Sequence, residues 1–305
     1  MKVNIASEQP KYNYQFEVAD TGIVGVYGIS GCGKSSLLDA LAGYNDNNQG
    51  TITFNNKRLQ GIVKCSYMNQ HPILFPHWSV QENLNFAIQY SKSNLKQLDD
   101  LLQKLNCNHL LDKRPNQLSG GEKQRIAFIR ALLMIEDNSL VLLDEPFSAL
   151  HPKLRKVALN LLNDYKKYSL IFLITHEISE LYQISDNLLY LKEGKIVYQD
   201  TTKNAMHSNY ENLPLASKVT FDDESHIIYA DDVSIGLQKN PQSSIVHQLD
   251  SNIQNIDTKD EITILRLKLN NKNILYAKIT EDSLKRLNLK QKQQVVANFK
   301  ATSSK

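Results

Sequence analysis

Apolar and polar residues follow different periods in different parts of the chain. Alternation in KVNIA and YQFEV predicts two half-buried strands near the N-terminus, and the apolar run GIVGVYG predicts a fully buried strand. The next stretch, KSSLLDALAG, predicts a helix that ends at Gly43. GTITFNNKRL then predicts a further hairpin strand. From about residue 78 to residue 133 the period becomes helical, and the leucines of LKQLDDLLQKL fall on one stripe.

Strand and helix patterns then alternate until about residue 205. The apolar runs SLVLLDEP and SLIFLITHE predict buried strands, and the helical stretch PKLRKVALNLLNDYKK separates them. This alternation predicts a parallel sheet covered by helices. We therefore expect an α/β domain over residues 1–205 that contains a helical subdomain at about 78–133.

The last third of the chain has a different pattern. HSNYENLPLASK carries turn-forming residues without a clear period, which indicates a linker over residues 206–220. After it, HIIYA, EITILRLKL, NILYAKI and QVVANFKAT read as short strands. Residues 221–305 are thus expected to form a small all-β domain, a barrel or a sandwich.

Composition narrows the class of protein. The 305 residues are 41% apolar and 22% charged with a net charge of +3, which is typical of a soluble globular protein and favours no nucleic-acid partner. Three scattered cysteines suit a reducing compartment better than a disulfide scaffold. The N-terminus does not resemble a secretory signal, and no apolar run is long enough to cross a membrane. Any membrane role is therefore expected to depend on a bound partner.

The segment GISGCGKSS fits the phosphate-binding loop GxxxxGK[ST], with a strand before it and a helix after it. Glycines let the backbone wrap an anion with its N–H groups inward, while Lys34 brings a charge to the β- and γ-phosphates and Ser35 offers a hydroxyl to Mg²⁺. A thiol at Cys32 could have a lowered pKa at the helix start, although a passive small residue is the simpler interpretation. The expected nucleotide-binding residues are Gly28, Ile29, Ser30, Gly31, Cys32, Gly33, Lys34, Ser35 and Ser36.

Two carboxylates follow the buried strand LVLLDEP, at the sheet edge where parallel sheets bind ligands. Adjacent side chains at a strand end point to opposite faces, so we expect separate tasks for them. Asp144 is expected to hold Mg²⁺, and Glu145 to orient and polarise the attacking water. His176 follows the next apolar strand at the same edge and is expected to sense the γ-phosphate.

A second anion site is indicated by QLSGGEKQR, which reads as a turn opening into a helix. Ser119, Gly120 and Gly121 leave backbone N–H groups free at a helix start, where negative charge is favoured. One chain therefore carries two sites suited to phosphate.

These motifs, together with Gln70 in YMNQHPILFP, resemble in content and order the nucleotide-binding subunits of ABC transporters over residues 1–205. The resemblance implies a homodimer in which ATP lies between the phosphate loop of one subunit and the LSGGE signature of the other, Ser119 to Glu122 included. It implies that Gln70 senses Mg²⁺ and the attacking water, and that the helical subdomain contacts a membrane permease dimer. The family's usual SALD reads SALH here, so the hydrogen bond made across the dimer by that aspartate is in doubt at His151. Tyr12, with Tyr14 as the alternative, is the expected adenine-stacking residue.

The tail resembles the molybdate-binding oligonucleotide-binding-fold module, of the Mop or TOBE type, which ends molybdate importer ATPases. The similarity lies in PQSSIVHQLDSNI, YAKITEDSLKRLNL and QVVANFKAT. Hydroxyls and a lysine suit a tetrahedral oxyanion such as molybdate or tungstate. Val246, His247 and Lys292 depart from the usual pattern, so the alternative is a β domain that only dimerises or regulates. The candidate oxyanion ligands are Ser243, Ser244, Ser283 and Lys300.

The resemblance therefore implies the ATP- and Mg²⁺-dependent subunit of an importer, most simply for molybdate, peripheral to the cytoplasmic face of a bacterial inner membrane. An external oxyanion-binding protein would be an indirect partner. Sulfate, ferric iron or a sugar are alternative cargoes. A soluble ABC ATPase and an oxyanion storage protein are alternatives of other classes. The former fits poorly, and the latter leaves the catalytic motifs without a role.

Overall fold

The structure is a computed structural model of the whole chain, and it describes residues 1–71, 73–208, 213–221, 224–239, 247–259, 262–270 and 273–299. The chain divides into two compact units, Met1–Thr202 and Lys203–Lys305. Each unit has its own sheet and its own hydrophobic core. The two units are therefore described separately.

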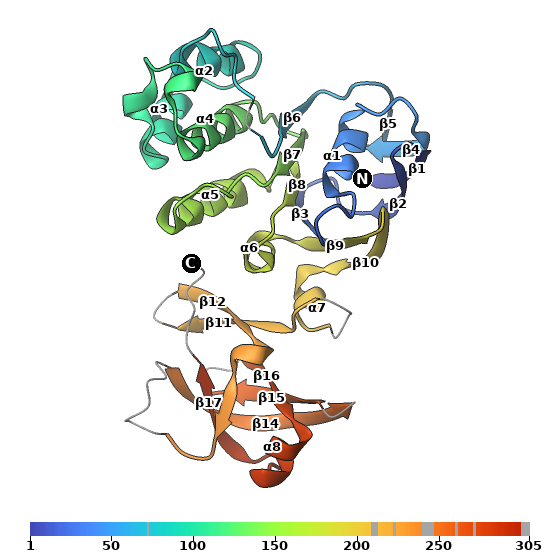
Figure 1. Cartoon of the computed structure of the whole chain (residues 1–305), viewed down its shortest axis with the longest axis vertical. Coiled ribbons are helices and arrows are strands. Elements are labelled where there is room, and N and C mark those ends of the chain that lie inside the picture. Colours follow the sequence, from blue (N-terminus) through green and yellow to red (C-terminus); the bar gives the residue numbers. More distant parts are fainter. Residues whose placement is uncertain are drawn as a thin grey trace. The chain divides into compact units, whose positions relative to one another are not determined.

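Within its described residues, the first unit is built on a ten-stranded sheet (Figure 1). Its two halves differ in strand direction: β3 pairs in parallel with β8 and β9, and β7 with β6 and β8, whereas β1, β2, β4 and β5 pair antiparallel. The sheet is thus mixed: the segments with strand–helix alternation form the predicted parallel part, and the N-terminal strands form antiparallel hairpins. The order across the sheet is β5 (Lys57–Leu59), β4 (Gln49–Phe54), β1 (Lys2–Glu8), β2 (Lys11–Glu17), β10 (Lys195–Thr201), β9 (Asn187–Lys192), β3 (Gly22–Tyr27), β8 (Leu170–Ile174), β7 (Leu140–Asp144) and β6 (Cys65–Met68).

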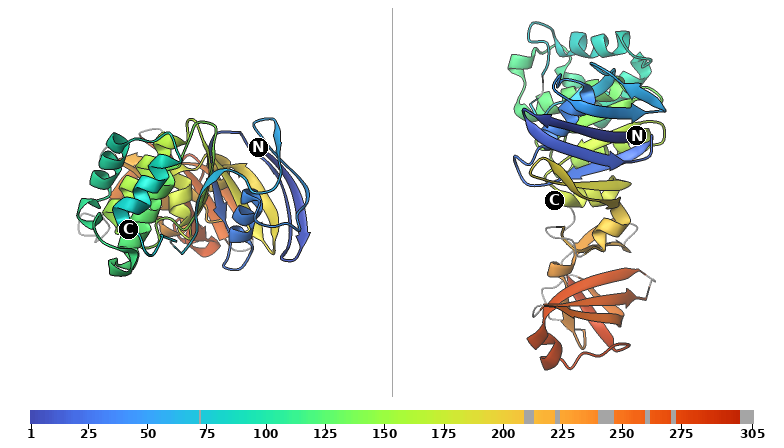
Figure 2. Two further views of the ribbon diagram at one scale, coloured as in Figure 1. Left: turned by 90° about the horizontal axis from the view of Figure 1, so that it is seen from above. Right: turned by 90° about the vertical axis from the view of Figure 1, so that its right-hand side faces the viewer.

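The antiparallel half shows the alternation that the sequence predicts. Every second residue of β1 and β2 is buried, and the register pairs Val3 with Phe16 and Ile5 with Tyr14. These side chains share one cluster with apolar residues of helix α1 (Lys34–Ala42). The right-hand view of Figure 2 shows the dark-blue strands side by side. One face of the hairpin is therefore committed to the core.

The parallel half carries the loops of chemical interest. Strands β7 and β8 are buried at every position, as strands covered on both faces must be. Helix α1 follows β3, and helix α5 (Pro152–Tyr165) joins β7 to β8. Helix α6 (Ile178–Ile184) follows β8. The carboxyl ends of β3, β7 and β8 consequently meet at one edge of the sheet.

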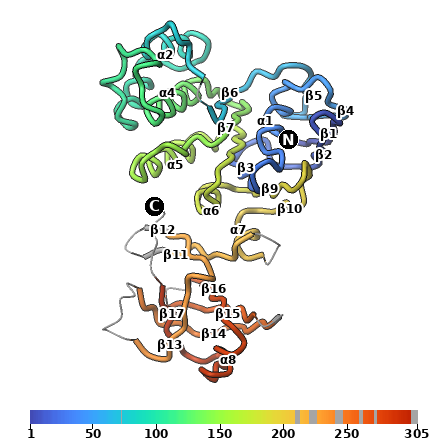
Figure 3. The backbone as a smooth tube through the Cα atoms, in the orientation of Figure 1, coloured from blue at the N-terminus to red at the C-terminus, as the bar shows by residue number. Residues whose placement is uncertain are grey.

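The predicted helical subdomain consists of α2 (Val80–Gln89), α3 (Leu95–Lys104), two short 3₁₀ turns and α4 (Gly120–Leu133). Figure 3 shows α2 and α4 together beyond the β6–β7 edge of the sheet. Both helices begin with the same device, a capping box in which serine and glutamate exchange hydrogen bonds with each other's backbone N–H. The helix start at Ser119 was predicted from the sequence, and the start at Ser79 has the same capping residues.

The second unit starts with α7 (Thr202–Met206) and continues with the two-stranded sheet of β11 (Ala216–Phe221) and β12 (Glu224–Tyr229). Among its described residues a five-stranded antiparallel sheet follows, with α8 (Glu281–Arg286) before the last strand. Strand β14 was not among the predicted strands, because polar residues interrupt its alternation. The order in that sheet is β13 (Ser234–Gly236), β17 (Gln294–Phe299), β14 (His247–Lys259), β15 (Ile262–Leu269) and β16 (Ile274–Thr280).

Candidate nucleotide-binding site

The phosphate loop is shaped by glycines in conformations that side chains disfavour. Gly28, Gly31 and Gly33 have φ angles of 156°, 79° and 106°. A Cβ on Gly28 would lie 2.5 Å from the Leu191 carbonyl oxygen, whereas one on Gly31 would meet nothing within 4 Å. Gly28 thus lets the loop pack closely against the backbone of Leu191, whereas Gly31 is required for its left-handed backbone and not for lack of space.

Lys34 lies in the first turn of α1 and is buried. Its ammonium donates hydrogen bonds to the carbonyl oxygens of Gly28, at 2.8 Å, and Ile29, at 3.1 Å. The carbonyl groups of the phosphate loop therefore hold the Lys34 ammonium in place, and a bound phosphate would compete with them for its N–H donors. Ser30, Gly31, Gly33 and Lys34 line one cavity with Ser35 and Ser36.

Ser35 and Asp144 form the second element of the site. The Ser35 hydroxyl donates to Asp144 Oδ2 at 2.6 Å, which joins the first residues of α1 to the last residue of β7. Burial raises the pKa of Asp144, and the Ser35 hydrogen bond and Lys34 partly oppose that rise. A hydroxyl beside a carboxylate is the oxygen-rich environment that Mg²⁺ prefers.

Glu145 does not continue the strand, and this corrects one prediction. Its φ of 51° is left-handed, so the alternation of faces stops at Asp144. Asp144 and Glu145 therefore line the same cavity and do not point to opposite faces. The Glu145 N–H donates to the Ile174 carbonyl at 3.0 Å, while its own carbonyl accepts from Gln124 and Ser148.

The side chain of Glu145 is 3% exposed. Burial raises its pKa to about 7, and the nearby Asp144 adds to the rise, while a hydrogen bond from the His176 backbone opposes it. His176 Nε2 lies 3.3 Å from Glu145 Oε1, an oxygen with no hydrogen-bond partner in the described part of the chain. A buried carboxyl with a pKa near neutrality is suited to accept a proton from water.

These groups surround one cavity of about 370 Å³. Phosphate-loop residues with a lysine, two carboxylates and a histidine line it together. The cavity suits a phosphate chain with a cation and a water molecule at its end. Its lining is Ser30, Gly31, Gly33, Lys34, Ser35, Ser36, Gln70, Asp144, Glu145, Ile174 and His176.

Three other predicted residues have different surroundings. Cys32 is buried, and burial raises the pKa of its thiol, which agrees with the passive interpretation. Tyr12 is 4% exposed, and its ring stacks on Tyr14 with centroids 4.5 Å apart. Because the ring is buried and stacked on Tyr14, it offers no free face to adenine, and its hydroxyl accepts a hydrogen bond from Asn45 at 2.6 Å. The structure therefore does not support Tyr12 as the adenine-stacking residue.

The signature segment opens helix α4 as predicted. Ser119 is the N-cap, and its hydroxyl accepts from the Glu122 N–H at 3.3 Å. The N–H groups of Gly120 and Gly121, the first two of the helix, have no intrahelical acceptor to reach. Ser119 and Gly120 are exposed, and neither lines the phosphate-loop cavity. The two anion sites of one chain are therefore separate.

Within one chain Glu122 caps helix α4, and its expected contact with nucleotide across a dimer stays a prediction. Its carboxylate accepts from the Ser119 N–H at 2.7 Å, and this bond lowers its pKa. A carboxylate held there repels phosphate. His151 caps helix α5 in a similar way, since its Nδ1 lies 3.5 Å from the Lys153 N–H.

The candidate oxyanion site can be placed only in part. Ser243, Ser244 and Lys300 lie outside the described residues. Ser283 lies in the first turn of α8, where its N–H and hydroxyl both contact Thr280 Oγ1, at 3.1 and 2.9 Å. In this position Ser283 completes a helix cap.

Two residues hold the site in ways that the sequence did not predict: Gln124 had no expected role, and Tyr14 was expected only as the alternative adenine-stacking residue. Gln124, buried within α4, donates to the Glu145 carbonyl at 2.6 Å. The Tyr14 hydroxyl donates to the Gly33 carbonyl at 2.8 Å. Gln124 lies inside the signature QLSGGEKQR, so the sequence indicates its place at the start of a helix but not that its side chain contacts the Glu145 carbonyl.

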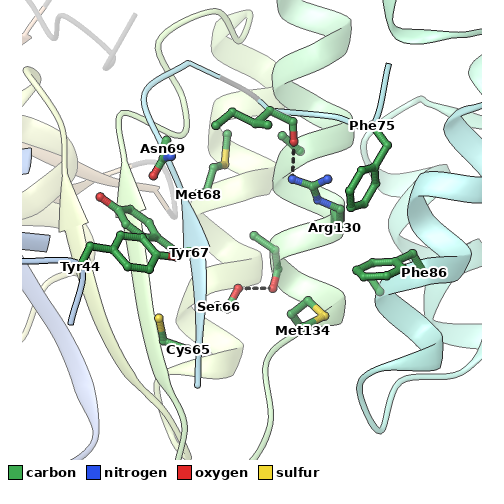
Figure 4. A pocket seen from close by; sticks show the side chains of 14 residues that line it. Tyr44, Cys65, Ser66, Tyr67, Met68, Asn69, Phe75, Phe86, Arg130 and Met134 are labelled. Atoms are coloured by element: carbon green, nitrogen blue, oxygen red, sulfur yellow. Dashed lines mark hydrogen bonds between the residues drawn. The ribbon is translucent and has the colours of Figure 1, made fainter. Parts of the chain in front are cut away.

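A second cavity of about 320 Å³ lies between β6 and helices α2 and α4 (Figure 4). Its wall is largely apolar and aromatic, with Phe75, Phe86 and Met134 on the side of the helical subdomain. Arg130 donates to the Ile73 carbonyl and lies 5.9 Å from the Phe75 ring centre. Tyr44 is 56% exposed at this cavity and stacks on Tyr67.

The described residues contain neither a membrane-spanning helix nor a preformed metal-binding cluster. None of their helices is both long and apolar enough to cross a membrane. Nor do they contain a cluster of three or more histidine, cysteine or acidic side chains placed to hold a metal. A magnesium site at Ser35 and Asp144 would thus depend on ligands from the phosphates and water.

Comparison with known families gives two matches. The ABC transporter family matches residues 12–148, and the TOBE domain matches residues 243–305. The chain is 33% identical to the thiamine import ATP-binding protein ThiQ of Vibrio cholerae, over 64% of this chain and 85% of that protein. It is 35% identical to the molybdenum import ATP-binding protein ModC of Mannheimia succiniciproducens over 64% of this chain, an alignment that spans only 58% of that protein.

A third relative aligns along its whole length. The ModC protein of Haemophilus influenzae is 28% identical over 99% of both chains. Proteins named for sulfate/thiosulfate and spermidine/putrescine import also match, at 34% and 36% identity. A solved ATP-binding cassette, described as a dimer bound to ADP and Pi, has the same fold with a TM-score of 0.55 at 23% identity, over 62% of this chain and 89% of that one.

Proposed function

This chain belongs to the ATP-binding proteins of ABC transporters, and from that premise we propose that it is the ATP-hydrolysing subunit of an importer. One observation carries the proposal: Lys34, Ser35, Asp144, Glu145 and His176, from three separate segments, surround a single cavity. The combination of a phosphate-binding loop and two adjacent carboxylates is suited to a nucleotide with its metal ion and less to an aminoacyl, sugar or redox substrate.

Hydrolysis would begin with proton transfer from water to Glu145. The pKa of about 7 places this carboxyl close to ambient pH, where it is both ionised in part and basic enough to accept the proton. Lys34 would balance the charge that develops on the phosphate oxygens. His176, 3.3 Å from Glu145, would contact the terminal phosphate and keep the carboxylate oriented.

Magnesium fits the donor set beside the phosphate loop. Ser35 and Asp144 would hold it, with Gln70 at the same cavity as a further oxygen ligand. When bound, the ion would neutralise negative charge on the β- and γ-phosphates. The Ser35–Asp144 pair supports this proposal, because its two oxygens lie 2.6 Å apart and both residues line the cavity.

The separate signature site supports action as a dimer. Ser119 and the N–H groups of Gly120 and Gly121 lie outside the cavity that holds the phosphate loop. We propose that these donors bind the terminal phosphate held by a second copy of the chain. ATP would then close the dimer, and hydrolysis would remove the charge that joins the two copies.

Full-length protein with ATP and Mg²⁺ provides the direct test. We expect steady release of phosphate, and a loss of at least about 100-fold in Lys34→Ala because the phosphates lose their cation. Lys64→Ala is a matched control, since its ammonium pairs with Glu136 on the surface. Equal rates for the chain and for Lys34→Ala would contradict the proposal.

The membrane partner is proposed to dock at the cavity between β6, α2 and α4. Its apolar wall and exposed Tyr44 are suited to a short amphipathic segment of a permease at the cytoplasmic face of the membrane (Figure 4). Phe86→Asp should abolish co-purification with the permease while the isolated chain still hydrolyses ATP. Leu95→Asp, at a residue 64% exposed on α3, is the control. Unchanged co-purification in Phe86→Asp would exclude this surface.

Molybdate or tungstate is the proposed cargo, and the TOBE match together with the full-length alignment to a molybdenum import protein supports it. An external oxyanion-binding protein would then deliver the anion to the permease. Titration calorimetry of the full chain with molybdate, tungstate and sulfate would test whether the second unit binds the anion. Uptake of the same anions by cells with and without the chain would test the cargo. Uptake of thiamine, sulfate or polyamine alone would reassign it.

A further inference from the structure

A buried carboxylate outside the catalytic cavity controls the turn that carries His176. Glu180, in the first turn of α6, is 3% exposed. Burial raises its pKa, and its bonds to Thr175 and Arg155 oppose the rise. A carboxylate in such a position is costly unless partners hold it. It has two: the Thr175 hydroxyl, 2.7 Å away, and Arg155 Nη1, 3.1 Å away.

The Thr175 hydroxyl closes the turn from both sides. It donates to Glu180 Oε2, and it accepts from the Glu177 N–H at 3.2 Å. Strand β8 ends at Ile174 and helix α6 begins at Ile178, so these two bonds span the whole connection. His176 is the residue enclosed between them.

His176 depends on this turn for its position. Its side chain is 56% exposed, so packing restrains the ring little. The ring nonetheless lies 3.3 Å from Glu145 Oε1. The backbone of the Thr175–Glu180 turn is therefore what places the imidazole at the carboxylate.

Arg155 joins the same turn to the segment that follows Glu145. It lies one turn into helix α5, whose N-cap is His151. Residues 145–151 connect β7 to that helix, so the Arg155–Glu180 ion pair ties the end of the catalytic segment to the connection after β8. The pair is largely protected from water, with side-chain exposures of 19% and 3%, so solvent screens it weakly.

We propose that Glu180 is a positioning residue that acts through Thr175 to hold His176 at Glu145, and that Arg155 links this turn to the segment leaving Glu145. The inference deepens the proposed ATPase function and rests on it. Neither Glu180 nor Thr175 lines the cavity, so their effect on hydrolysis passes through His176.

Thr175→Val is the central variant, because it removes the hydroxyl and keeps the shape. We expect kcat for ATP to fall about 10-fold or more, as misplacement of a catalytic group does, with the KM for ATP within about twofold of wild type. Thr175→Ser should restore most of the activity. Glu180→Gln should fall between them, because it keeps a bond to Thr175 and loses the charge opposite Arg155.

A double-mutant cycle separates positioning from general stability. In a His176→Ala background, Thr175→Val should change kcat by less than about twofold, because the residue it positions is already gone. The same fold-loss in both backgrounds would overturn the inference. Glu180→Ala leaves a largely covered guanidinium without its partner, so unfolding alone would explain its loss of activity, and this variant does not distinguish the two explanations.

The histidine signals of the full chain provide a readout that needs no turnover. Selective labelling gives eight histidine resonances, and the one missing in His176→Ala identifies His176. Thr175→Val should shift that resonance and leave the other seven in place. If the His176 resonance shifts in Thr175→Val but the wild-type chain hydrolyses no ATP, the proposed function is refuted and the positioning role of Thr175 is kept. If the wild-type chain hydrolyses ATP but Thr175→Val neither shifts the His176 resonance nor lowers kcat, the positioning role alone is refuted.

Discussion

The side chain of Gln124 donates a hydrogen bond to the main-chain carbonyl of Glu145 at 2.6 Å. Gln124 lies in α4, the helix that Ser119 opens, and Glu145 directly follows the last residue of β7. The helix that carries the signature is therefore in direct contact with the backbone of the proposed catalytic residue. Because Glu145 has a left-handed backbone, this bond stabilises a conformation that an acidic residue adopts only at a cost.

Removing this bond should lower both stability and turnover. In Gln124→Leu the Glu145 carbonyl keeps only its two longer bonds from Ser148, from the hydroxyl at 3.2 Å and from the N–H at 3.4 Å. We expect the free energy of unfolding to fall by about 1–3 kcal/mol and kcat to fall several-fold. Gln97→Leu is the matched control, since Gln97 in α3 donates a hydrogen bond of 3.0 Å to the hydroxyl of Tyr165 in α5. Urea unfolding and ATPase rates measure both effects, and equal kcat in the two variants would contradict the link.

Glu145→Gln should separate ATP binding from hydrolysis. The amide cannot take the proton from water, so turnover should fall by at least about 100-fold. ATP would then persist between two copies, and light scattering after gel filtration should detect dimers with ATP and Mg²⁺ but monomers without nucleotide. A variant that remains monomeric with ATP would be evidence against the shared site.

The pH profile of kcat should carry the signature of Glu145. Because burial raises its pKa to about 7, the carboxyl is protonated below neutrality and cannot act as the base. We expect kcat to fall as pH drops from 8 to 6, measured by initial rates at saturating ATP. A profile that stays flat to pH 5.5 would mean that this carboxylate is not the base.

Stability should change with pH in the opposite sense. A carboxyl whose pKa is raised on folding stabilises the fold fully below its unfolded value near 4.5, and the contribution is lost as pH rises through 7. Wild type should therefore lose stability relative to Glu145→Gln between pH 5 and pH 8, by on the order of 2–3 kcal/mol. Paired urea titrations at both pH values measure the difference, and a constant difference would contradict the raised pKa.

Ser119→Ala should affect hydrolysis beyond its effect on the helix. Loss of the N-cap should cost about 1 kcal/mol of unfolding free energy. ATPase activity should also fall, while ATP binding to the monomer is kept. Ser79→Ala removes the equivalent cap from α2, where Ser79 and Glu82 form the same capping box. The control should lose similar stability and retain its ATPase rate; a parallel loss of activity in both variants would assign Ser119 a capping role alone.

Local patterns in the sequence determined the elements and most of the chemistry. The alternation in β1 and β2, the glycines before Lys34 and the capping signals at Ser79 and Ser119 act through neighbours in the chain. Such signals need no distant contact, since backbone sterics and nearby hydrogen bonds suffice. The family resemblance followed from these motifs and their order.

Tertiary structure decided what those signals could not. The burial of Tyr12 against Tyr14, the placement of Asp144 and Glu145 in one cavity, and the bond from Gln124 to the Glu145 carbonyl depend on contacts between separate segments. The same is true of Glu180, which has no visible role until Thr175 and Arg155 meet it. Periodicity reports which side of an element is apolar, whereas the partner across the interface is fixed only when the elements pack.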